Sequence, residues 1–404
     1  MKKHRVVYTC GGRSFFSVSP GRKIFSVVNC WRGMGHSVAH VCGGDIFDTS
    51  SAVKPPEYGA GSFHRQWYRR VRVLDPLIRT VSERRDIQHD AMMEKHLVHV
   101  SETFRPDLIW ERSCRLHCAG LVTARRLGVP YVLEWKDNIA SYWLSLYRQR
   151  ARAMERWKNL EADFIVTESE VLRKNLMGEG VDGNKILVAQ NAVDPTQFCR
   201  DTDAGLQIRA KLGIASDTVL VGYLGSYAWY HDAGRLVKAM ALLRKQGVAN
   251  VRCLMVGAGK EYDITRRLAE KRGLLGEEVI MTPGVPKDEV PGVLAALDIA
   301  VLPGSTDIIC PIKIQEYMAC ELPSVVPDYA CNREVLCDGD TGMLFCPKNE
   351  VALAEKIGIL VGDRELRERI GRKAREVVAR QFTWEKTWGA ALETVLGLKC
   401  GGQN

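Results

Sequence analysis

The segment PIKIQEYMACELPSVV, residues 311–326, places a lysine and a glutamate near the start of a predicted helix. Pro311 suits the first position of a helix, where its missing N–H leaves no bond unmade. The unpaired N–H groups and the dipole of a helix start attract phosphate. Lys313 adds a full positive charge, and Glu316, about one turn further on, is placed to accept both hydroxyls of a ribose. The segment therefore predicts a nucleoside diphosphate site that needs no divalent metal. The alternative is a helix whose lysine and glutamate only face water.

The elements that position this segment follow a regular pattern. Short apolar runs alternate with helical stretches through both halves of the chain, as in RVVYT, PDLIWE and PYVLEW, and again in TVLVGYLGS, VRCLMVGAG and DIAVLPGS. This alternation is typical of parallel sheets covered by helices on both faces. It predicts an α/β chain of two doubly wound domains. Ligands of such domains bind at the carboxyl ends of the strands, so the loops after these runs are the places to look for chemistry.

Composition narrows the class of protein. The chain has 404 residues, 46% hydrophobic and 26% charged, which predicts two globular domains rather than a disordered chain. It contains no apolar run long enough for a transmembrane helix, and its first residues lack the pattern of a signal peptide. Thirteen cysteines without a C-x-x-C pair favour reduced thiols and a cytoplasmic protein. Cys114, His117 and Cys118 are interpreted as packing residues on a helix, because no second pair of metal ligands is visible.

Positive charge is concentrated in the first half of the chain. Residues 1–200 carry 31 Lys and Arg against 21 Asp and Glu, whereas residues 201–404 carry 26 against 27. Two segments, 63–74 and 147–158, mix arginine with tryptophan and tyrosine. They are compatible with a solvated face, with a nucleic-acid patch, or with an interfacial helix for anionic lipid or an anionic acceptor. No zinc-finger or RNA-binding signature supports nucleic acid. The expected location is the cytoplasm, with peripheral contact at the inner face of the membrane as an alternative.

Several segments together resemble one known family. CPIKIQEYMACELPSVV is similar to the donor-site motif of family 4 retaining glycosyltransferases, and GMGHSV, RPDLIWERS, VTESEVLRKNL, KILVAQNAVDPTQF, DGDTGMLF and QFTWEKTW resemble further family segments in the family's order. The resemblance implies the GT-B fold of two Rossmann-like domains facing across a cleft. Residues 1–200 would bind the acceptor, residues 201–380 the donor, and a helix in 381–404 would cross back to the first domain. By contrast, neither GGRS nor VGAG matches the G-x-G-x-x-G fingerprint of a dehydrogenase.

The resemblance also implies roles for individual residues. Glu316 falls on the glutamate that binds the donor ribose, but Ile308 stands where the family has its first glutamate. The loop GSYAWYHD lacks the usual arginine and lysine, which leaves Lys313 and His231 to bind the diphosphate. Lys136 in LEWKD stands where a histidine often contacts the donor, and Lys136, Asp137 and Lys313 are the predicted catalytic residues. The other predicted donor-binding residues are Gly11, Gly12, Gly225, Ser226, Gly257, Val285, Asp307, Ile308, Ile309, Cys310 and Ile312.

The function implied is a retaining glycosyltransferase that needs no metal or other cofactor and gives an α-glycoside. Its donor would be a UDP-sugar or, as the second choice, a GDP-sugar, and its acceptor would be anionic, lipid-linked or soluble. The family resemblance implies front-face attack, in which the leaving diphosphate accepts the proton of the acceptor. A GT-B sugar-nucleotide epimerase is one alternative. The replaced glutamate at Ile308 keeps a second alternative open, a sugar-nucleotide binding protein without catalysis.

Overall fold

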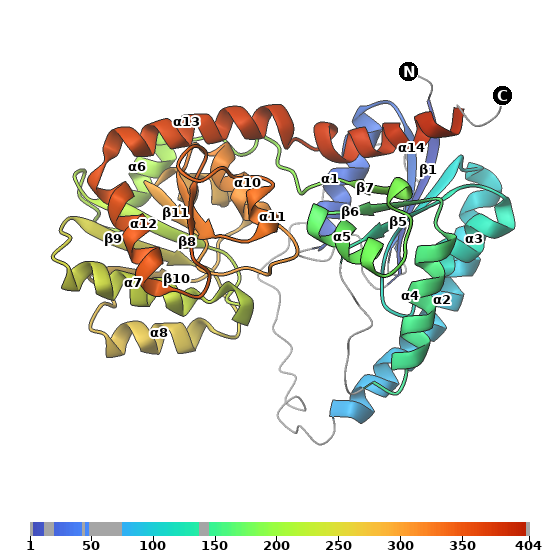
Figure 1. The fold of residues 1–404 in the computed structure, drawn as a ribbon, viewed down its shortest axis with the longest axis horizontal. Helices are drawn as coiled ribbons and strands as arrows, with labels where there is room; N and C mark the ends of the chain where they lie inside the picture. Colours follow the sequence, from blue (N-terminus) through green and yellow to red (C-terminus); the bar gives the residue numbers. More distant parts are fainter. Residues whose placement is uncertain (1–2, 12–19, 43–44, 48–74, 137–144, 401–404) are drawn as a thin grey trace. The chain divides into compact units, whose positions relative to one another are not determined.

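The computed structural model describes residues 3–11, 20–42, 45–47, 75–136 and 145–400. The chain forms two compact units (Figure 1). Unit 1 consists of residues 1–168, 172–189 and 388–404, and unit 2 of residues 169–171 and 190–387. Each unit is built on one sheet, which confirms the predicted α/β fold with two doubly wound domains.

Unit 1 contains a seven-stranded sheet in the order β3-β2-β1-β4-β5-β6-β7, parallel except for β3. Its strands are β1 Arg5–Cys10, β2 Ser37–Cys42, β3 Asp45–Phe47, β4 Leu108–Arg112, β5 Tyr131–Trp135, β6 Phe164–Thr167 and β7 Ile186–Val188. Its helices are α1 Pro20–Gly33, α2 Asp75–Phe104, α3 Ala119–Leu127, α4 Arg148–Glu161, α5 Glu170–Gly178 and the short η3 Gly183–Lys185. All residues of β4 and β5 are buried, which agrees with their nearly continuous apolar sequence.

The end of the chain packs against unit 1 through α14, Ala390–Cys400, which follows a π-helical turn at Glu385–Gly389 (Figure 1). Trp388 is fully buried, and its carbonyl accepts a hydrogen bond of 3.0 Å from the indole of Trp31. The His36 imidazole lies 2.9 Å from the carboxylate of Glu393 on α14. This segment is therefore part of the core of unit 1, although it lies more than 350 residues from Trp31 in the sequence.

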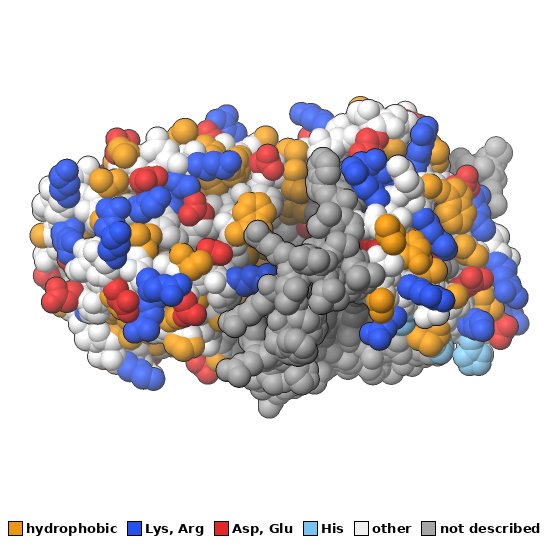
Figure 2. Space-filling view, turned by 90° about the horizontal axis from the view of Figure 1, so that it is seen from below, with side chains coloured by type: hydrophobic (Ala, Val, Ile, Leu, Met, Phe, Trp, Pro, Cys, Tyr) orange, Lys and Arg blue, Asp and Glu red, His pale blue; other side chains and the backbone are white. Residues whose placement is uncertain are grey.

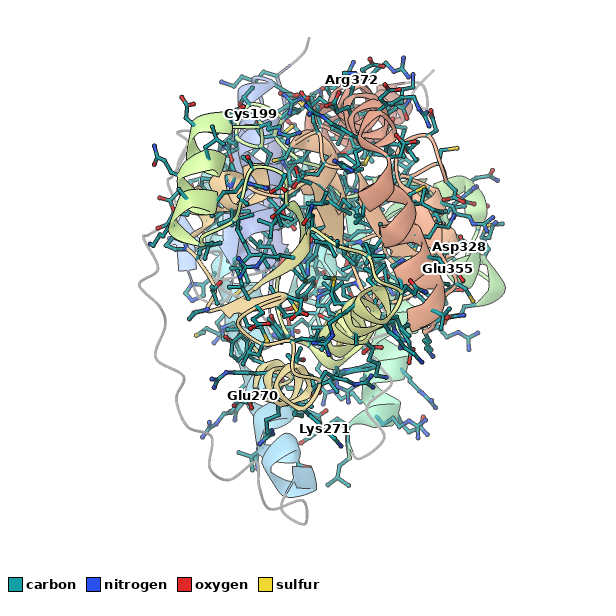
Figure 3. The ribbon with its side chains drawn as sticks, turned by 90° about the vertical axis from the view of Figure 1, so that its left-hand side faces the viewer. Cys199, Glu270, Lys271, Asp328, Glu355 and Arg372 are labelled. Atoms are coloured by element: carbon teal, nitrogen blue, oxygen red, sulfur yellow. The ribbon has the colours of Figure 1, made fainter. Side chains whose placement is uncertain are left out.

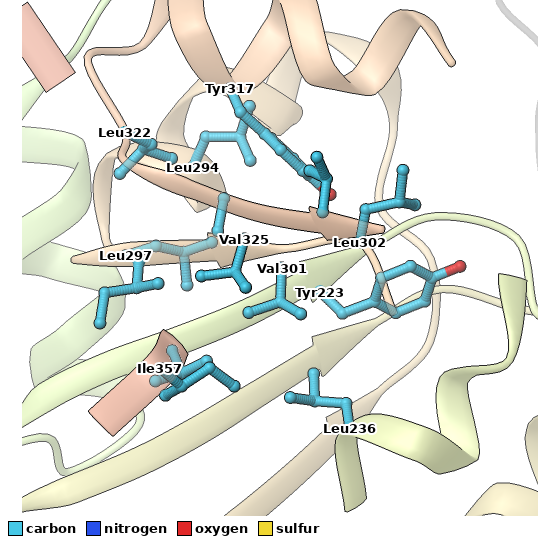
Figure 4. Packing of buried hydrophobic residues seen from close by; sticks show 14 of the residues in the cluster. Tyr223, Leu236, Leu294, Leu297, Val301, Leu302, Tyr317, Leu322, Val325 and Ile357 are labelled. Carbon is cyan, nitrogen blue, oxygen red and sulfur yellow. The ribbon is translucent and has the colours of Figure 1, made fainter. Parts of the chain in front are cut away.

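Unit 2 contains a six-stranded parallel sheet in the order β10-β9-β8-β11-β12-β13. Its strands are β8 Val219–Leu224, β9 Val251–Val256, β10 Val279–Thr282, β11 Ile299–Val301, β12 Ser324–Pro327 and β13 Met343–Phe345. Its helices are α6 Thr202–Lys211, η4 Trp229–His231, α7 Ala233–Lys245, α8 Tyr262–Lys271, η5 Lys287–Glu289, α9 Val290–Ala295, α10 Ile312–Ala319, α11 Ala330–Arg333, α12 Glu350–Gly362 and α13 Arg364–Gln381. Figure 4 shows how Val301 and Val325 of the central strands pack with Tyr317 of α10 in its core.

The outside of unit 2 carries exposed charged side chains together with exposed hydrophobic ones such as Trp229 and Ile264. Figure 3 labels Glu355 on α12 and Arg372 on α13, and both are exposed. On the face shown in Figure 2, basic, acidic and hydrophobic side chains are interspersed over the described residues. Among the described helices, none has the length and apolar character needed to cross a membrane.

Two local predictions were wrong. Cys114, His117 and Cys118 lie in the loop before α3, not on a helix, and Leu116 in this loop has a positive φ of 61°. Pro311 is the N-cap of α10 and not its first helical residue, because its ψ of 137° is extended. The basic segment 63–74 lies outside the described residues.

Candidate functional site

The site in unit 2 is built from loops at one edge of its sheet. Because all six strands are parallel, the loops after β8, β9, β10 and β11 leave the same edge. These loops carry residues 225–232, 257–261, 283–289 and 302–311, and the last of them leads into α10. The structure thus brings the predicted donor-binding segments of this half to one edge, as the apolar runs indicated.

Two glycines make room in these loops. Gly225 has a φ of 158°, and a Cβ atom at this position would lie 2.2 Å from the Nζ of Lys313. Gly257 has a φ of 149°, and a Cβ atom there would lie 1.8 Å from the carbonyl oxygen of Gly225. Any side chain at either position would occupy space that the neighbouring loop or the lysine now fills. The glycines therefore permit the close approach of the β8 loop, the β9 loop and α10.

Lys313 lies at the centre of this arrangement. Its Nζ is 3.3 Å from the Nε2 of His231 and 5.2 Å from the centre of the Tyr223 ring. The other nitrogen of His231, Nδ1, is 3.3 Å from the carbonyl oxygen of Gly304. Lys313 is half-buried and His231 is 6% exposed. The ammonium of Lys313 thus lies against Gly225 and His231 of the β8 loop, and His231 in turn contacts Gly304 of the β11 loop.

Burial sets the protonation of both bases. Burial lowers the pKa of Lys313 to about 8, although the nearby Glu316 carboxylate acts in the opposite direction. Burial and the charge of Lys313 lower the pKa of His231 to about 4, against the hydrogen bond to Gly304. Lys313 therefore carries a charge at neutral pH, whereas His231 is neutral. The pair supplies one full positive charge.

The start of α10 adds backbone donors beside this lysine. No side chain caps the helix at Pro311, so the first turn keeps N–H groups for a ligand. The preceding loop is fixed through its carbonyls: Asn191 donates a hydrogen bond of 3.0 Å to Cys310, and the hydroxyl of Ser169 donates one to Ile308. Glu316 lies one turn into the helix and is half-buried. Phosphate-binding donors and a carboxylate therefore share one helix end.

The other predicted residues occupy different environments. Asp307 and Ser226 are exposed, Val285, Ile308, Ile309 and Ile312 are half-buried, and Cys310 is buried. In unit 1, Gly11 is buried, and a Cβ atom there would lie 2.1 Å from the ring of His117. Lys136 is half-buried just after β5. Gly12 and Asp137 lie outside the described residues.

Unit 1 holds an ionic cluster that sequence reasoning missed. Glu134 of β5 is fully buried and accepts hydrogen bonds from Tyr8 at 2.8 Å, from Trp110 at 3.3 Å, and from Arg112. Arg112 also lies 3.7 Å from the carboxylate of Glu168. The only signal in the sequence was a glutamate inside the apolar run PYVLEW. A buried carboxylate of this kind requires several donors, so such a glutamate predicts a network without naming its members.

Lys23 of α1 completes this cluster. Its ammonium binds Glu168, lies 3.6 Å from Glu134, and sits 3.8 Å from the centre of the Trp388 ring. Burial lowers the pKa of Lys23 to about 7, although the charge of Glu168 opposes this shift. The charge of Lys136 acts on both Lys23 and Glu168. The predicted catalytic lysine of unit 1 therefore lies near a buried, nearly neutral group of charges at the carboxyl ends of β4, β5 and β6.

Family comparisons match both units. Residues 206–377 match the family model described as glycosyl transferases group 1, and residues 20–192 match the glycosyl transferase 4-like domain. The chain is a glycosyltransferase of the family 4 type with the GT-B fold. This finding confirms the predicted class of enzyme.

Individual relatives have low sequence identity to this chain, below 30% for the two curated proteins named next. The chain is 27% identical over 279 residues to a GDP-mannose-dependent α-(1-6)-phosphatidylinositol monomannoside mannosyltransferase of Mycolicibacterium smegmatis, a match that covers 68% of this chain and 72% of the relative. It is 29% identical over 241 residues to the D-inositol 3-phosphate glycosyltransferase of Nocardia farcinica, covering 58% of this chain but only 52% of that relative. The fold resembles that of Anabaena HepE in complex with UDP, with a TM-score of 0.72, 16% identity and coverage of 97% of this chain and 100% of the other.

Proposed function

We propose that this chain transfers a sugar from a nucleoside-diphosphate sugar to an acceptor hydroxyl, with retention of configuration and without a divalent metal. One observation carries the proposal: the ammonium of Lys313 lies at the start of α10, against the space left by Gly225. A positive charge, backbone donors and an absent side chain together suit a diphosphate. Glu316, one turn further along α10, would accept the hydroxyls of the ribose.

The proposed chemistry uses the charge that develops on the leaving diphosphate. Lys313 and the N–H groups of α10 would stabilise this charge as the bond to the sugar breaks. One diphosphate oxygen would take the proton of the acceptor hydroxyl on the same face, which gives an α-glycoside. Lys136 of unit 1 would contact the donor. Since a cation and a helix end supply the positive field, a divalent metal has no required part in this scheme.

The identity of the donor is tested by thermal denaturation with UDP, GDP, ADP and CMP. A nucleotide at a hundred times its dissociation constant stabilises the folded protein by about 2.7 kcal/mol. UDP is expected to stabilise most, with GDP as the second choice, because a structural neighbour binds UDP and one relative is named for GDP-mannose. Sugar transfer from the matching donor should continue in EDTA. A strict requirement for manganese or magnesium would contradict the scheme.

A second candidate function is nucleotide-sugar binding without catalysis. It is favoured by one feature, the hydrophobic Ile308 where a glutamate would contact the donor sugar, with exposed Asp307 beside it. The two functions differ in turnover. Release of nucleoside diphosphate from a donor that the protein binds, in the presence of candidate acceptors, supports the transferase. Donor binding without any release supports the alternative.

For the acceptor, we propose an anionic or lipid-linked molecule that meets the basic face of unit 1 in the cytoplasm. The exposed side of α4 carries Arg150, Arg152 and Arg156, and Trp157 beside them is 41% exposed. Arginine and tryptophan together are typical of contact with anionic interfaces. Flotation with phosphatidylglycerol vesicles tests a membrane surface. Binding that is lost at high salt supports it, and no binding at low salt favours a soluble acceptor.

A further inference from the structure

His231 is an unusual neighbour for a lysine, because both side chains are bases. The carbonyl oxygen of Gly304 can only accept a hydrogen bond, so the Nδ1 atom of His231, 3.3 Å away, carries the proton. The Nε2 atom therefore presents its lone pair to the Nζ of Lys313, which donates at 3.3 Å. The tautomer of His231 therefore determines that Lys313 is the donor in the hydrogen bond between them.

The groups around His231 explain why this arrangement is stable without a ligand. The Tyr230 ring lies 4.5 Å from the imidazole, centre to centre, and the Tyr223 ring lies 6.4 Å away. Lys313 is the charged group that faces Nε2. The adjacent Asp232 is engaged by Arg235, which also binds Glu350. The nearest carboxylate along the chain is therefore already neutralised.

At Gly225 the charge of a ligand would come next to this pair. Gly225 leaves the Nζ of Lys313 without a covering side chain, and a Cβ atom there would lie 2.2 Å from it. A diphosphate bound at the start of α10 would bring two negative charges to Lys313. Its ammonium would then turn from Nε2 to a phosphate oxygen, which leaves the Nε2 lone pair of His231 unpaired beside an anion.

We propose that His231 holds Lys313 in position in the free protein and takes up a proton from solvent at Nε2 when a diphosphate binds. The inference rests on the proposed function, because it requires the diphosphate to lie at Lys313. It makes His231 a positioning residue whose charge depends on the ligand. The site would then present one cation when it is empty and two when it is occupied.

The proposal gives a specific dependence of donor affinity on pH. If one proton is taken up, affinity falls about tenfold for each unit of rising pH between the pKa of His231 in the free protein and its higher pKa in the complex. Burial and Lys313 lower the pKa of His231 in the free protein to about 4, so the window opens at about that pH. Lys313, whose pKa burial lowers to about 8, adds a separate window of proton uptake above that pH.

The experiment is isothermal titration calorimetry with UDP-glucose and with GDP-mannose, at about pH 6.5, in buffers of different ionisation enthalpy. The phosphates of these donors are diesters and do not titrate in this range, so any proton uptake belongs to the protein. We expect an uptake of about half to one proton per donor bound by the wild type. His231→Gln keeps an acceptor for Lys313 but cannot be protonated, and it should abolish the uptake and the dependence of affinity on pH below about 7.

Two further variants guard the interpretation. His231→Asn keeps a donor toward Gly304 and also cannot titrate, so it should abolish the proton uptake as well. It replaces His231→Gln in the test if that variant is poorly folded. His99→Gln removes an exposed histidine of unit 1, whose side chain is 80% exposed, and should leave the uptake unchanged. Donor binding without proton uptake, or uptake that survives in both His231 variants, overturns this inference alone. If the wild type binds neither these two donors nor any of the nucleotides UDP, GDP, ADP and CMP, the proposed function fails and this inference fails with it.

Discussion

Replacing Gly225 with alanine tests the site without removing any functional group. The new Cβ atom would lie 2.2 Å from the Nζ of Lys313, whereas ordinary contacts begin at 3.4 Å. Because Nζ is the end of a flexible side chain, the ammonium rather than the backbone would give way. It must withdraw by at least 1.2 Å, the difference between these two distances. The substitution therefore moves the positive charge away from the place where a diphosphate would lie.

The expected loss follows from Coulomb's law. With an effective dielectric constant of about 20, moving a unit charge from about 3.0 to about 4.2 Å from a phosphate oxygen weakens the attraction by about 1.6 kcal/mol, or about fifteenfold. The backbone adds a cost in stability, because Gly225 has a φ of 158° that a residue with a Cβ adopts poorly. That strain is about 1–3 kcal/mol and affects the melting temperature rather than the charge.

The assay is kcat/KM for donor turnover, measured well below the melting temperature of each variant. Gly234→Ala in α7 is the matched control, since its Cβ atom would lie 3.4 Å from the nearest atom and its φ is not positive. The control should keep the wild-type rate. Gly257→Ala, whose Cβ atom would lie 1.8 Å from a backbone oxygen, should lose stability above all. A Gly225→Ala enzyme that is folded and as fast as the wild type would refute the placement of the diphosphate at Lys313.

Three other substitutions test the two units. Lys313→Ala should lower turnover by about 10²–10³-fold with a smaller effect on donor binding, because the lysine acts on charge that develops in the transition state; an unchanged rate would move this role to another base. Glu316→Ala should weaken nucleotide binding by about 2–3 kcal/mol in calorimetry while leaving the melting temperature unchanged, and unchanged binding would remove the ribose assignment. In unit 1, burial opposes ionisation of Glu168, but Lys23 and Arg112 lower its pKa to about 2. A lowered pKa stabilises the fold above the unfolded value near 4.5, and this stability is lost as pH falls toward about 2. Glu168→Gln should therefore flatten the acid side of the unfolding curve between these two pH values, and an unchanged curve would contradict the ion pair.

The fold could be predicted well from the sequence because the strands of both sheets are short apolar runs that can be recognised locally. Each buried parallel strand of unit 2 is a short apolar run that ends in proline or is followed within two residues by glycine or proline. The strands and the edge that bears the site could therefore be located directly. The long helix α2 has only a weak pattern in the sequence, for a physical reason. Among its residues with described burial, 80–81 and 83–104, the fully buried apolar ones are Met93 and Leu97, and charged residues occupy much of the rest. The helical period is therefore visible over only a part of its length.

The ionic cluster of unit 1 could not be predicted in the same way. Lys23, Arg112, Glu134 and Glu168 come from four separate elements, and each is buried only because the others are. An isolated charge of this kind would be costly, so burial depends on partners that no local pattern identifies. Glutamate within the run PYVLEW indicated that such partners exist, but only the topology of the sheet brings Arg112 to its side.

The donor site lies between these two cases. The sequence shows directly that GSYAWYHD lacks arginine and lysine and that Lys313 is present. It does not show how Lys313 compensates for the missing basic residues of the loop. The structure shows that His231 of that loop turns toward Lys313, and that Gly225 and Gly304 leave the space in which this occurs. A guanidinium in that loop would carry a charge at every physiological pH. A histidine beside a lysine carries one only when an anion compensates for the repulsion between them. A histidine in this loop in place of an arginine thus exchanges a permanent charge for one that depends on the ligand. For this reason the pH dependence of donor affinity, more than the affinity itself, distinguishes this site from one with a permanent second cation.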